Sequence, residues 1–300
     1  MQIASPVVLV LCGGGSRGAL EVGFYRAVHE LGLAIDLVIG SSIGALNGAF
    51  IAAGTPPDEL ARLWLEVRRQ DVMRWNWKGL LRPRREPGLY TLDPLRELLR
   101  RRLPAARFED LSIPLTITTT DLQLGKAVNW SGSGDLIEPL VASLSLPVFF
   151  PPVRIGDHQL VDGGVANNVP LDQASALGAR HALMIHCACC RGIPSSFAGM
   201  LGVLGRSLSI AFDCKYNIDR EHVGKTVQLH VVRPELQLDV GLLDFRRTAE
   251  LIDAGYRQTL EYFRAQSARK KLCSSVATEL SNSEPAAMAQ ANSFHQTGAL

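Results

Sequence analysis

The stretch Val38–Ala45, with the sequence VIGSSIGA, constrains the fold more than any other part of the chain. An apolar run enters a Gly-Ser-Ser-Ile-Gly turn, and a segment rich in Ala, Leu and Gly follows as far as Ala53. This pattern predicts a strand, a sharp turn and a helix, with Ser42 at the apex and Gly40 and Gly44 two residues to either side. Glycine at both flanks lets the strand and the helix approach the turn without a steric clash.

Such a turn would present the hydroxyl group of Ser42 beside a helix N-terminus, whose free N–H groups favour negative charge. A serine nucleophile needs both features. The same spacing of small residues also occurs in ordinary tight strand–helix turns, so a purely structural role stays open on this stretch alone. Ser41 is the weaker candidate, because the glycines are not symmetric about it.

A second glycine-rich segment, GGGSRG, follows the apolar strand predicted over residues 7–12. Gly13, Gly15 and Gly18 fit the G-x-G-x-x-G pattern of dinucleotide-binding folds. Those folds place an acidic residue near the end of the second strand, where it binds a ribose. Here the second strand ends in Gly-Ser-Ser, and Asp36 lies at its beginning. The pattern therefore gives little support to a nucleotide-dependent oxidoreductase.

The alternative for this glycine loop is an oxyanion hole, in which backbone N–H groups stabilise a negatively charged oxygen. We expect Arg17 to hold the loop in shape or to contact a substrate phosphate. The predicted segment comprises Gly13, Gly14, Gly15, Arg17 and Gly18.

Composition excludes several classes of function. The chain has 300 residues, of which 47% are hydrophobic, and a formal net charge of +2, so nothing suggests bulk binding of nucleic acid. The apolar N-terminal run is short and lacks basic residues, and no stretch reaches the roughly 18 uncharged apolar residues of a membrane span. We therefore expect a cytoplasmic protein. The six cysteines do not resemble a disulfide framework, and Cys187–Cys190 has no partner pair at zinc-finger spacing, so no metal site is expected.

Strands and helices are predicted to alternate along the chain. The strands lie over residues 7–12, 36–40, 113–121, 126–130, 182–187 and 227–232, with short ones near Val153 and Gln159. The helices lie over residues 20–31, 45–53, 56–69, 93–103, 136–144, 170–177, 195–212 and 245–264. From about residue 265 the periodicity is lost, so we predict one domain over residues 1–265 and a disordered tail over residues 266–300.

A serine nucleophile needs a base to accept its proton. None of the seven histidines lies in an obvious catalytic loop. Asp162 ends a predicted strand and is followed by Gly163 and Gly164, which let an aspartate loop approach another backbone closely. Asp162 is therefore the candidate base, with a simple Asp-Gly turn as the alternative.

The irregular stretch over residues 71–90 combines aromatic and basic side chains, which suit a bilayer interface and anionic head groups. It predicts a membrane-facing flap over the site. The alternative is a surface loop whose tryptophans pack on the core. The residues concerned are Trp75, Trp77, Arg82, Arg84 and Arg85.

Taken together, three stretches resemble the patatin-like phospholipases in order, spacing and context: Gly13–Gly18, Gly40–Gly44 and Asp162–Gly164. Supporting similarity lies in the segments ALN after the turn, TTDL, ASLSLP, FPP and NNVP, and the resemblance covers roughly residues 7–187. Leu144 and Leu146 are bulkier than the usual residues of the family and would shape the acyl pocket.

The resemblance implies a three-layer α/β/α fold with a central, mostly parallel sheet. It also implies a lipid acyl hydrolase of the phospholipase A or lysophospholipase type. Ser42 would be the nucleophile and Asp162 the base of a dyad that forms an acyl-enzyme, with the glycine loop as the oxyanion hole. Membrane phospholipids or lysophospholipids would be the substrates, reached by peripheral contact, with no cofactor or metal ion. A catalytically silent or regulatory lipid-binding protein of the same fold is the alternative.

Overall fold

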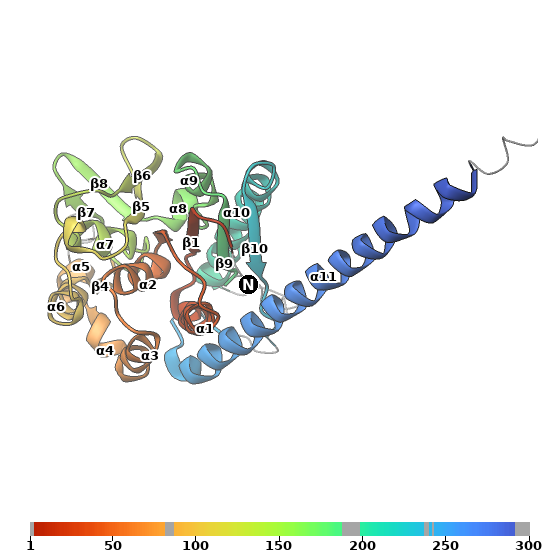
Figure 1. Cartoon of the computed structure of the whole chain (residues 1–300). Coiled ribbons are helices and arrows are strands. Elements are labelled where there is room, and N and C mark those ends of the chain that lie inside the picture. Colours follow the sequence, from red (N-terminus) through yellow and green to blue (C-terminus); the bar gives the residue numbers. More distant parts are fainter. Residues whose placement is uncertain (1–2, 82–86, 188–198, 237–239, 242, 292–300) are drawn as a thin grey trace, which may run out of the picture. The chain divides into compact units, whose positions relative to one another are not determined.

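The computed structural model describes residues 3–81, 87–187, 199–236, 240–241 and 243–291 (Figure 1). Two compact units are distinguished, Gln2–Thr259 and a second made of Leu260–Leu300. All strands and the candidate site belong to the first unit. The described part of the second unit, residues 260–291, belongs to the last helix, α11 (Thr248–Ala291).

A mixed sheet forms the centre of the first unit, with the strand order β10-β9-β1-β2-β5-β8-β7 and with β6 also paired to β5. The pairs from β10 to β5 are parallel, whereas β8 pairs antiparallel with β5 and β7, and β6 pairs antiparallel with β5. The strands of this sheet are β1 (Val7–Leu11), β2 (Leu37–Ser41), β5 (Leu115–Asp121), β6 (Lys126–Trp130), β7 (Val153–Ile155), β8 (His158–Asp162), β9 (His181–Ile185) and β10 (Gln228–Val232).

Helices flank the sheet in two groups. In one group α2 packs on α1, α3 and α7, and α1 also packs on α3, whereas in the other group α10 packs on α8 and α9. The helices of the first unit are α1 (Ala19–Glu30), α2 (Ile43–Ala52), α3 (Pro57–Glu66), α4 (Arg69–Val72), α5 (Trp77–Leu81), α6 (Asp93–Arg102), α7 (Ile137–Ser143), α8 (Gly164–Asn167), α9 (Leu171–Ala176) and α10 (Gly199–Val223), with the start of α11. Short 3-10 turns are η1 (Gly15–Gly18), η2 (Phe108–Asp110) and η3 (Phe245–Arg247).

Residue patterns explain where these elements lie. All five residues of β1 (VVLVL) and all seven of β5 are buried, as expected of strands covered on both faces. Helix α2 is apolar around most of its circumference, because it lies between the sheet and the neighbouring helices. Helix α6 is amphipathic, with Leu95 and Leu99 buried and its terminal arginines exposed. The predicted fold class is confirmed.

Several predicted boundaries need correction. The segment over residues 71–90 is not wholly irregular, because it contains α5 and a two-stranded ribbon of β3 (Arg74–Trp75) and β4 (Tyr90–Thr91). Helix α10 continues past residue 212 to Val223, and α11 is described as helical to Ala291, far beyond residue 264. Disorder over residues 266–300 stays a prediction, and residues 292–300 lie outside the described part. No helix among the described residues is both long enough and apolar enough to cross a bilayer.

Candidate active site

Ser42 occupies a strained turn between β2 and α2. Its backbone has φ 54° and ψ −128°, and apart from glycines only Val148 among the described residues shares a positive φ. A Cβ atom on Gly40 would lie 2.5 Å from the carbonyl oxygen of Gly44, and one on Gly44 would lie 2.5 Å from the backbone of Leu11. The predicted steric reason for both glycines is therefore present in the structure.

The structure brings Ser42 and Asp162 together. The Ser42 hydroxyl donates a hydrogen bond of 2.6 Å to Oδ2 of Asp162 across 120 residues of sequence. Strand β5 makes this meeting possible, because its register places Thr118 beside Ser41 of β2 and Thr119 beside Asp162 of β8. The ends of two strands that do not pair with each other thus meet across a third.

Burial dominates the electrostatics of Asp162. Its second oxygen, Oδ1, accepts the N–H of Gly164 at 2.7 Å, and its backbone carbonyl accepts the hydroxyl of Thr120 at 2.9 Å. Desolvation raises the pKa of Asp162 from 3.8 to about 6, against the opposing effect of the hydrogen bonds from Ser42 and Gly164. A carboxyl group with this pKa is largely ionised at neutral pH yet more basic than an exposed aspartate.

Glycine at position 163 is also required by close packing. A Cβ atom there would lie 2.1 Å from the carbonyl oxygen of Thr118, and one on Gly164 would lie 2.7 Å from the side chain of Asn168. The Asp-Gly-Gly segment therefore lies directly against β5, which is the close approach that the sequence predicts.

The glycine loop lies against the turn of Ser42. A Cβ atom on Gly13 would be 3.1 Å from Cβ of Ser42 and 2.1 Å from Oδ1 of Asn168. The N–H of Gly13 donates to the carbonyl oxygen of Asn168 at 3.0 Å, and Nδ2 of Asn168 donates back to the Gly13 carbonyl at 3.3 Å. Gly13 is therefore not available as an oxyanion donor, which corrects that part of the prediction.

Other members of the predicted loop have separate structural roles. Arg17 donates from its backbone N–H and from Nε to the carbonyl of Gly14, at 3.2 and 3.3 Å, so it holds the loop in shape. Gly18 packs tightly, since a Cβ atom there would lie 2.6 Å from Ile43. The N–H groups of Gly14 and Gly15 find no hydrogen-bond partner among the described residues, and both residues line the cavity described below.

Two polar residues that support the site have no predicted role from sequence. Ser143, at the end of α7, accepts the backbone N–H of Ser42 at 2.9 Å and donates its hydroxyl to the Thr118 carbonyl at 2.7 Å. Asn168 fastens the glycine loop. Both lie in segments that resemble the family (ASLSLP and NNVP), which is the one signal that could have drawn attention to them.

A cavity of about 560 Å³ opens beside the Ser42 hydroxyl, within the usual range for ligand pockets. Its lining is mostly aliphatic and aromatic, and Leu144 and Leu146 belong to it as the sequence predicts. Helix α10 contributes Leu204, Leu208 and Phe212, to which the sequence assigned no function. No histidine of the described residues lines this cavity.

Both tryptophans of the predicted flap are exposed, Trp75 to 57% and Trp77 to 69%. The ring of Trp75 lies 4.9 Å from that of Tyr90, which lies 6.1 Å from Phe150 in the cavity wall. These tryptophans therefore do not pack into the core, and an aromatic contact path joins Trp75 to the cavity. Arg82, Arg84 and Arg85 lie outside the described residues.

The structure places Asp36, the acidic residue considered for the dinucleotide-binding alternative, away from the glycine loop. Oδ2 of Asp36 accepts the N–H of Val7 at 2.7 Å, at the start of β1, whereas the glycine loop follows the end of that strand. Asp36 is thus engaged at the opposite edge of the sheet from the loop.

The fold and the site define a class: an α/β protein in which a serine turn, a glycine loop and an aspartate loop converge beside an apolar cavity. The family model described as patatin-like phospholipase matches residues 9–175, which is more than half of the chain. The chain therefore belongs to the patatin-like phospholipase family, as its sequence motifs predict.

Relatives of known name are similar over part of the chain. Patatin-like phospholipase domain-containing protein 7 of Mus musculus is 31% identical over 190 residues, which are 62% of this chain and 14% of the relative. Neuropathy target esterase sws of Drosophila melanogaster is 32% identical over 182 residues, 59% of this chain and 12% of the relative. The chain thus spans only a small part of the length of these relatives. Among solved structures, VipD of Legionella pneumophila is similar with a TM-score of 0.45 and 15% identity, covering 86% of this chain and 66% of VipD.

Proposed function

We propose that the chain hydrolyses carboxylic esters of lipids, with Ser42 as nucleophile and Asp162 as base. The hydrogen bond of 2.6 Å between Ser42 Oγ and Asp162 Oδ2 carries this proposal. It joins a hydroxyl on a strained strand–helix turn to a buried carboxylate, and geometry of this kind is the first requirement of a nucleophile and its base. Membership of the family supports the same reaction class.

In the first half of the reaction, Ser42 Oγ attacks the ester carbonyl carbon while its proton passes to Asp162 Oδ2. The carbonyl oxygen becomes an oxyanion, for which the N–H groups of Gly14 and Gly15 are the proposed donors. When the tetrahedral intermediate collapses, the alcohol leaves with the proton from Asp162, and the acyl group stays on Ser42. Water then attacks the acyl-enzyme, again through Asp162, and the fatty acid is released as Ser42 regains its proton.

The typical rate enhancements indicate that the base and the oxyanion donors would both contribute substantially to catalysis. General-base catalysis typically contributes about 10²- to 10⁴-fold. The raised pKa of Asp162, about 6, brings its basicity closer to the working pH than that of an exposed aspartate. One oxyanion donor contributes about 3 kcal/mol, so two N–H groups would supply at least as much as the base.

The cavity indicates the part of the substrate that is bound. Its apolar walls, from Leu46 and Phe50 of α2 to Leu204 and Leu208 of α10, suit a fatty acyl chain. Burial of such a chain stabilises the complex by about 0.8 kcal/mol for each methylene group. Phospholipids or lysophospholipids are therefore the proposed substrates.

Peripheral contact with a membrane is proposed through the exposed flap. Trp75, Trp77 and Leu81 are exposed on consecutive short elements, and Val72 and Met73, which directly precede them, line the cavity. Tryptophan prefers the bilayer interface, and basic residues near anionic lipid contribute about 1 kcal/mol each. Replacing Arg82, Arg84 and Arg85 together should weaken binding to anionic vesicles and spare hydrolysis of a short soluble ester.

A fluorophosphonate probe tests the proposed chemistry. We expect the wild-type chain to be labelled at Ser42, and Ser42→Ala to lose both labelling and hydrolysis of a panel of lipids followed by mass spectrometry. Ser41→Ala is a matched control, because the Ser41 hydroxyl is buried and has no hydrogen-bond partner among the described residues. Lipid binding without labelling or turnover would favour the silent lipid-binding alternative, and full activity in Ser42→Ala would refute the mechanism.

A further inference from the structure

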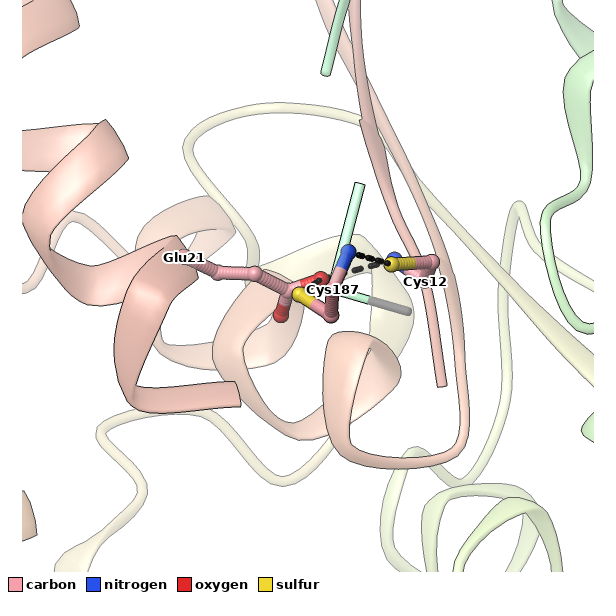
Figure 2. A group of neighbouring side chains, drawn as sticks. All are labelled: Cys12, Glu21 and Cys187. Carbon is pink, nitrogen blue, oxygen red and sulfur yellow. Dashed lines mark hydrogen bonds between the residues drawn. The ribbon is translucent and has the colours of Figure 1, made fainter. Parts of the chain in front are cut away.

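Beneath the glycine loop, three side chains that the proposed reaction does not use point toward one another (Figure 2). They are Cys12, which follows β1, Glu21 in the first turn of α1, and Cys187, which follows β9. All three are fully buried, and their sulfur and carboxylate oxygen atoms lie within 4.8 Å of one another. Both cysteines are free thiols.

Three distances in this cluster are close to the edge lengths of a zinc-centred tetrahedron. With Zn–S bonds of about 2.3 Å and Zn–O bonds of about 2.0–2.2 Å, neighbouring ligand atoms stand about 3.5–3.8 Å apart. Sγ of Cys187 lies 3.7 Å from Oε1 of Glu21. The carbonyl oxygen of Ile185 lies 3.5 Å from Sγ of Cys12 and 3.9 Å from Sγ of Cys187. Three of the six edges of such a tetrahedron are therefore close to the required length.

Hydrogen bonds already orient these donor atoms. The backbone N–H of Cys12 and Nδ2 of Asn47 donate to the two oxygens of Glu21, at 2.7 and 2.9 Å. The backbone N–H of Cys187 donates to Sγ of Cys12 at 3.5 Å. Asn47 is itself fixed by Trp64, whose Nε1 donates to it at 2.8 Å. Such outer hydrogen bonds are what hold metal ligands in place and favour their ionised forms.

A cation at this position would balance the charge of an ionised Glu21. Its hydrogen-bond donors in the described part of the chain are neutral amides and a thiol, and burial of a carboxylate without an opposite charge is costly. A divalent cation together with the carboxylate and the two thiolates would leave a residual charge of −1.

We propose that Cys12, Glu21 and Cys187, with the carbonyl oxygen of Ile185, bind one Zn²⁺ ion. Two thiolates and two oxygens suit zinc, which is borderline soft and prefers four ligands in a tetrahedron. All four positions are filled by the chain, so the site is structural and leaves none for a substrate. The ion would join β1, α1 and β9 directly below the loop, where Cβ of Cys187 stands 3.1 Å from the position of a Cβ on Gly14.

Metal analysis of the full chain tests this site without reference to catalysis. The protein is expressed with added zinc, purified in a thiol-free reductant without chelator, and measured by plasma mass spectrometry. We expect one zinc ion per chain. Exchange for Co²⁺ should give the intense visible bands of a tetrahedral site with a thiolate-to-cobalt band in the near ultraviolet. A folded wild-type chain without stoichiometric zinc, or one in which Cys12 and Cys187 form a disulfide, overturns the proposal.

Variants locate the ion. Cys12→Ser and Cys187→Ser should lose the near-ultraviolet cobalt band, and Glu21→Gln should weaken Zn²⁺ binding more than about 10-fold, since loss even of outer partners costs that much. Cys214→Ser is the matched control, because Cys214 is free and exposed. The double variant Cys189→Ser with Cys190→Ser tests the alternative that Cys187 binds the metal together with these neighbouring cysteines.

Both controls should keep one zinc ion. Zinc that persists in Cys12→Ser, or is lost in the Cys189→Ser/Cys190→Ser protein, assigns the metal elsewhere and refutes the site. If a cysteine variant does not fold, the melting temperature of the wild-type chain is measured instead. A chelator should then lower its melting temperature, and zinc should restore it, whereas an unchanged melting temperature counts against the proposal.

Discussion

Replacing Asp162 by asparagine should abolish activity and, at alkaline pH, make the protein more stable. The asparagine side chain would have nearly the same shape and would still accept the N–H of Gly164, which donates to Oδ1 in the native chain. It cannot accept the proton of Ser42, so most of kcat should be lost. It also carries no charge, and this difference determines the effect on stability.

The size of the effect follows from the pKa of Asp162. Its value rises from 3.8 to about 6 on folding because the carboxylate is desolvated, and each pKa unit corresponds to about 1.4 kcal/mol. A raised pKa means that the folded chain prefers the protonated form. Stability from this group is fully present below pH 3.8 and falls by about 3 kcal/mol as pH rises through about 6. The variant has no ionisable group at this position. Its free energy of unfolding should therefore exceed that of the wild type by up to about 3 kcal/mol at pH 8 and by almost nothing at pH 4.

Urea unfolding of wild-type and Asp162→Asn chains at both pH values measures this difference. Asp157→Asn is a matched control on the same hairpin, because Asp157 is exposed. In parallel, kcat/KM of the wild type on a soluble ester should rise with pH through about 6 and level off above it. A variant that is less stable than wild type at pH 8, or a flat activity profile between pH 5 and 8, would contradict a buried, ionisable base.

Three further substitutions probe the surroundings of the site. Ser143→Ala should cost about 1–3 kcal/mol in urea unfolding and lower kcat, because the part-buried Ser42 N–H loses its acceptor; unchanged values would show that this hydrogen bond is dispensable. Gly14→Val should reduce kcat more than it raises KM in steady-state kinetics, since the oxyanion contact forms fully only in the transition state; a change confined to KM would exclude that role. Trp75→Ala with Trp77→Ala should weaken vesicle co-sedimentation but spare a short soluble ester, and equal losses on both would make the flap structural.

Local patterns were sufficient to predict most elements of the fold. The buried strand β1, the β5–β6 hairpin and the turn at Ser42 each depend on residues that are neighbours in sequence. Their apolar runs, glycines and prolines therefore report their structure directly. The order of strands in the sheet, with β8 antiparallel beside β5, depends on pairings between distant segments and has no such local signal.

The parts of the site that sequence reasoning missed are the ones made by distant contacts. Gly13 has the residue type and spacing of an oxyanion donor, but its N–H donates to the carbonyl oxygen of Asn168, which is distant in the sequence. Cys12 and Cys187 are 175 residues apart, and no spacing rule for metal ligands extends so far. Helix α10 lines the cavity through Leu204 and Leu208, although its sequence carries no motif.

Strand β5 explains how a dyad of this geometry can form at all, although it contributes no reacting group. The carbonyl of Thr118 accepts the hydroxyl of Ser143, which in turn holds the N–H of Ser42. The hydroxyl of Thr120 donates to the carbonyl of Asp162, which holds the proposed base on the other side of the strand. Because one fully buried strand positions both residues, their separation does not depend on a flexible loop. The proposed nucleophile and base, held in this way, would not need a third residue to orient the base.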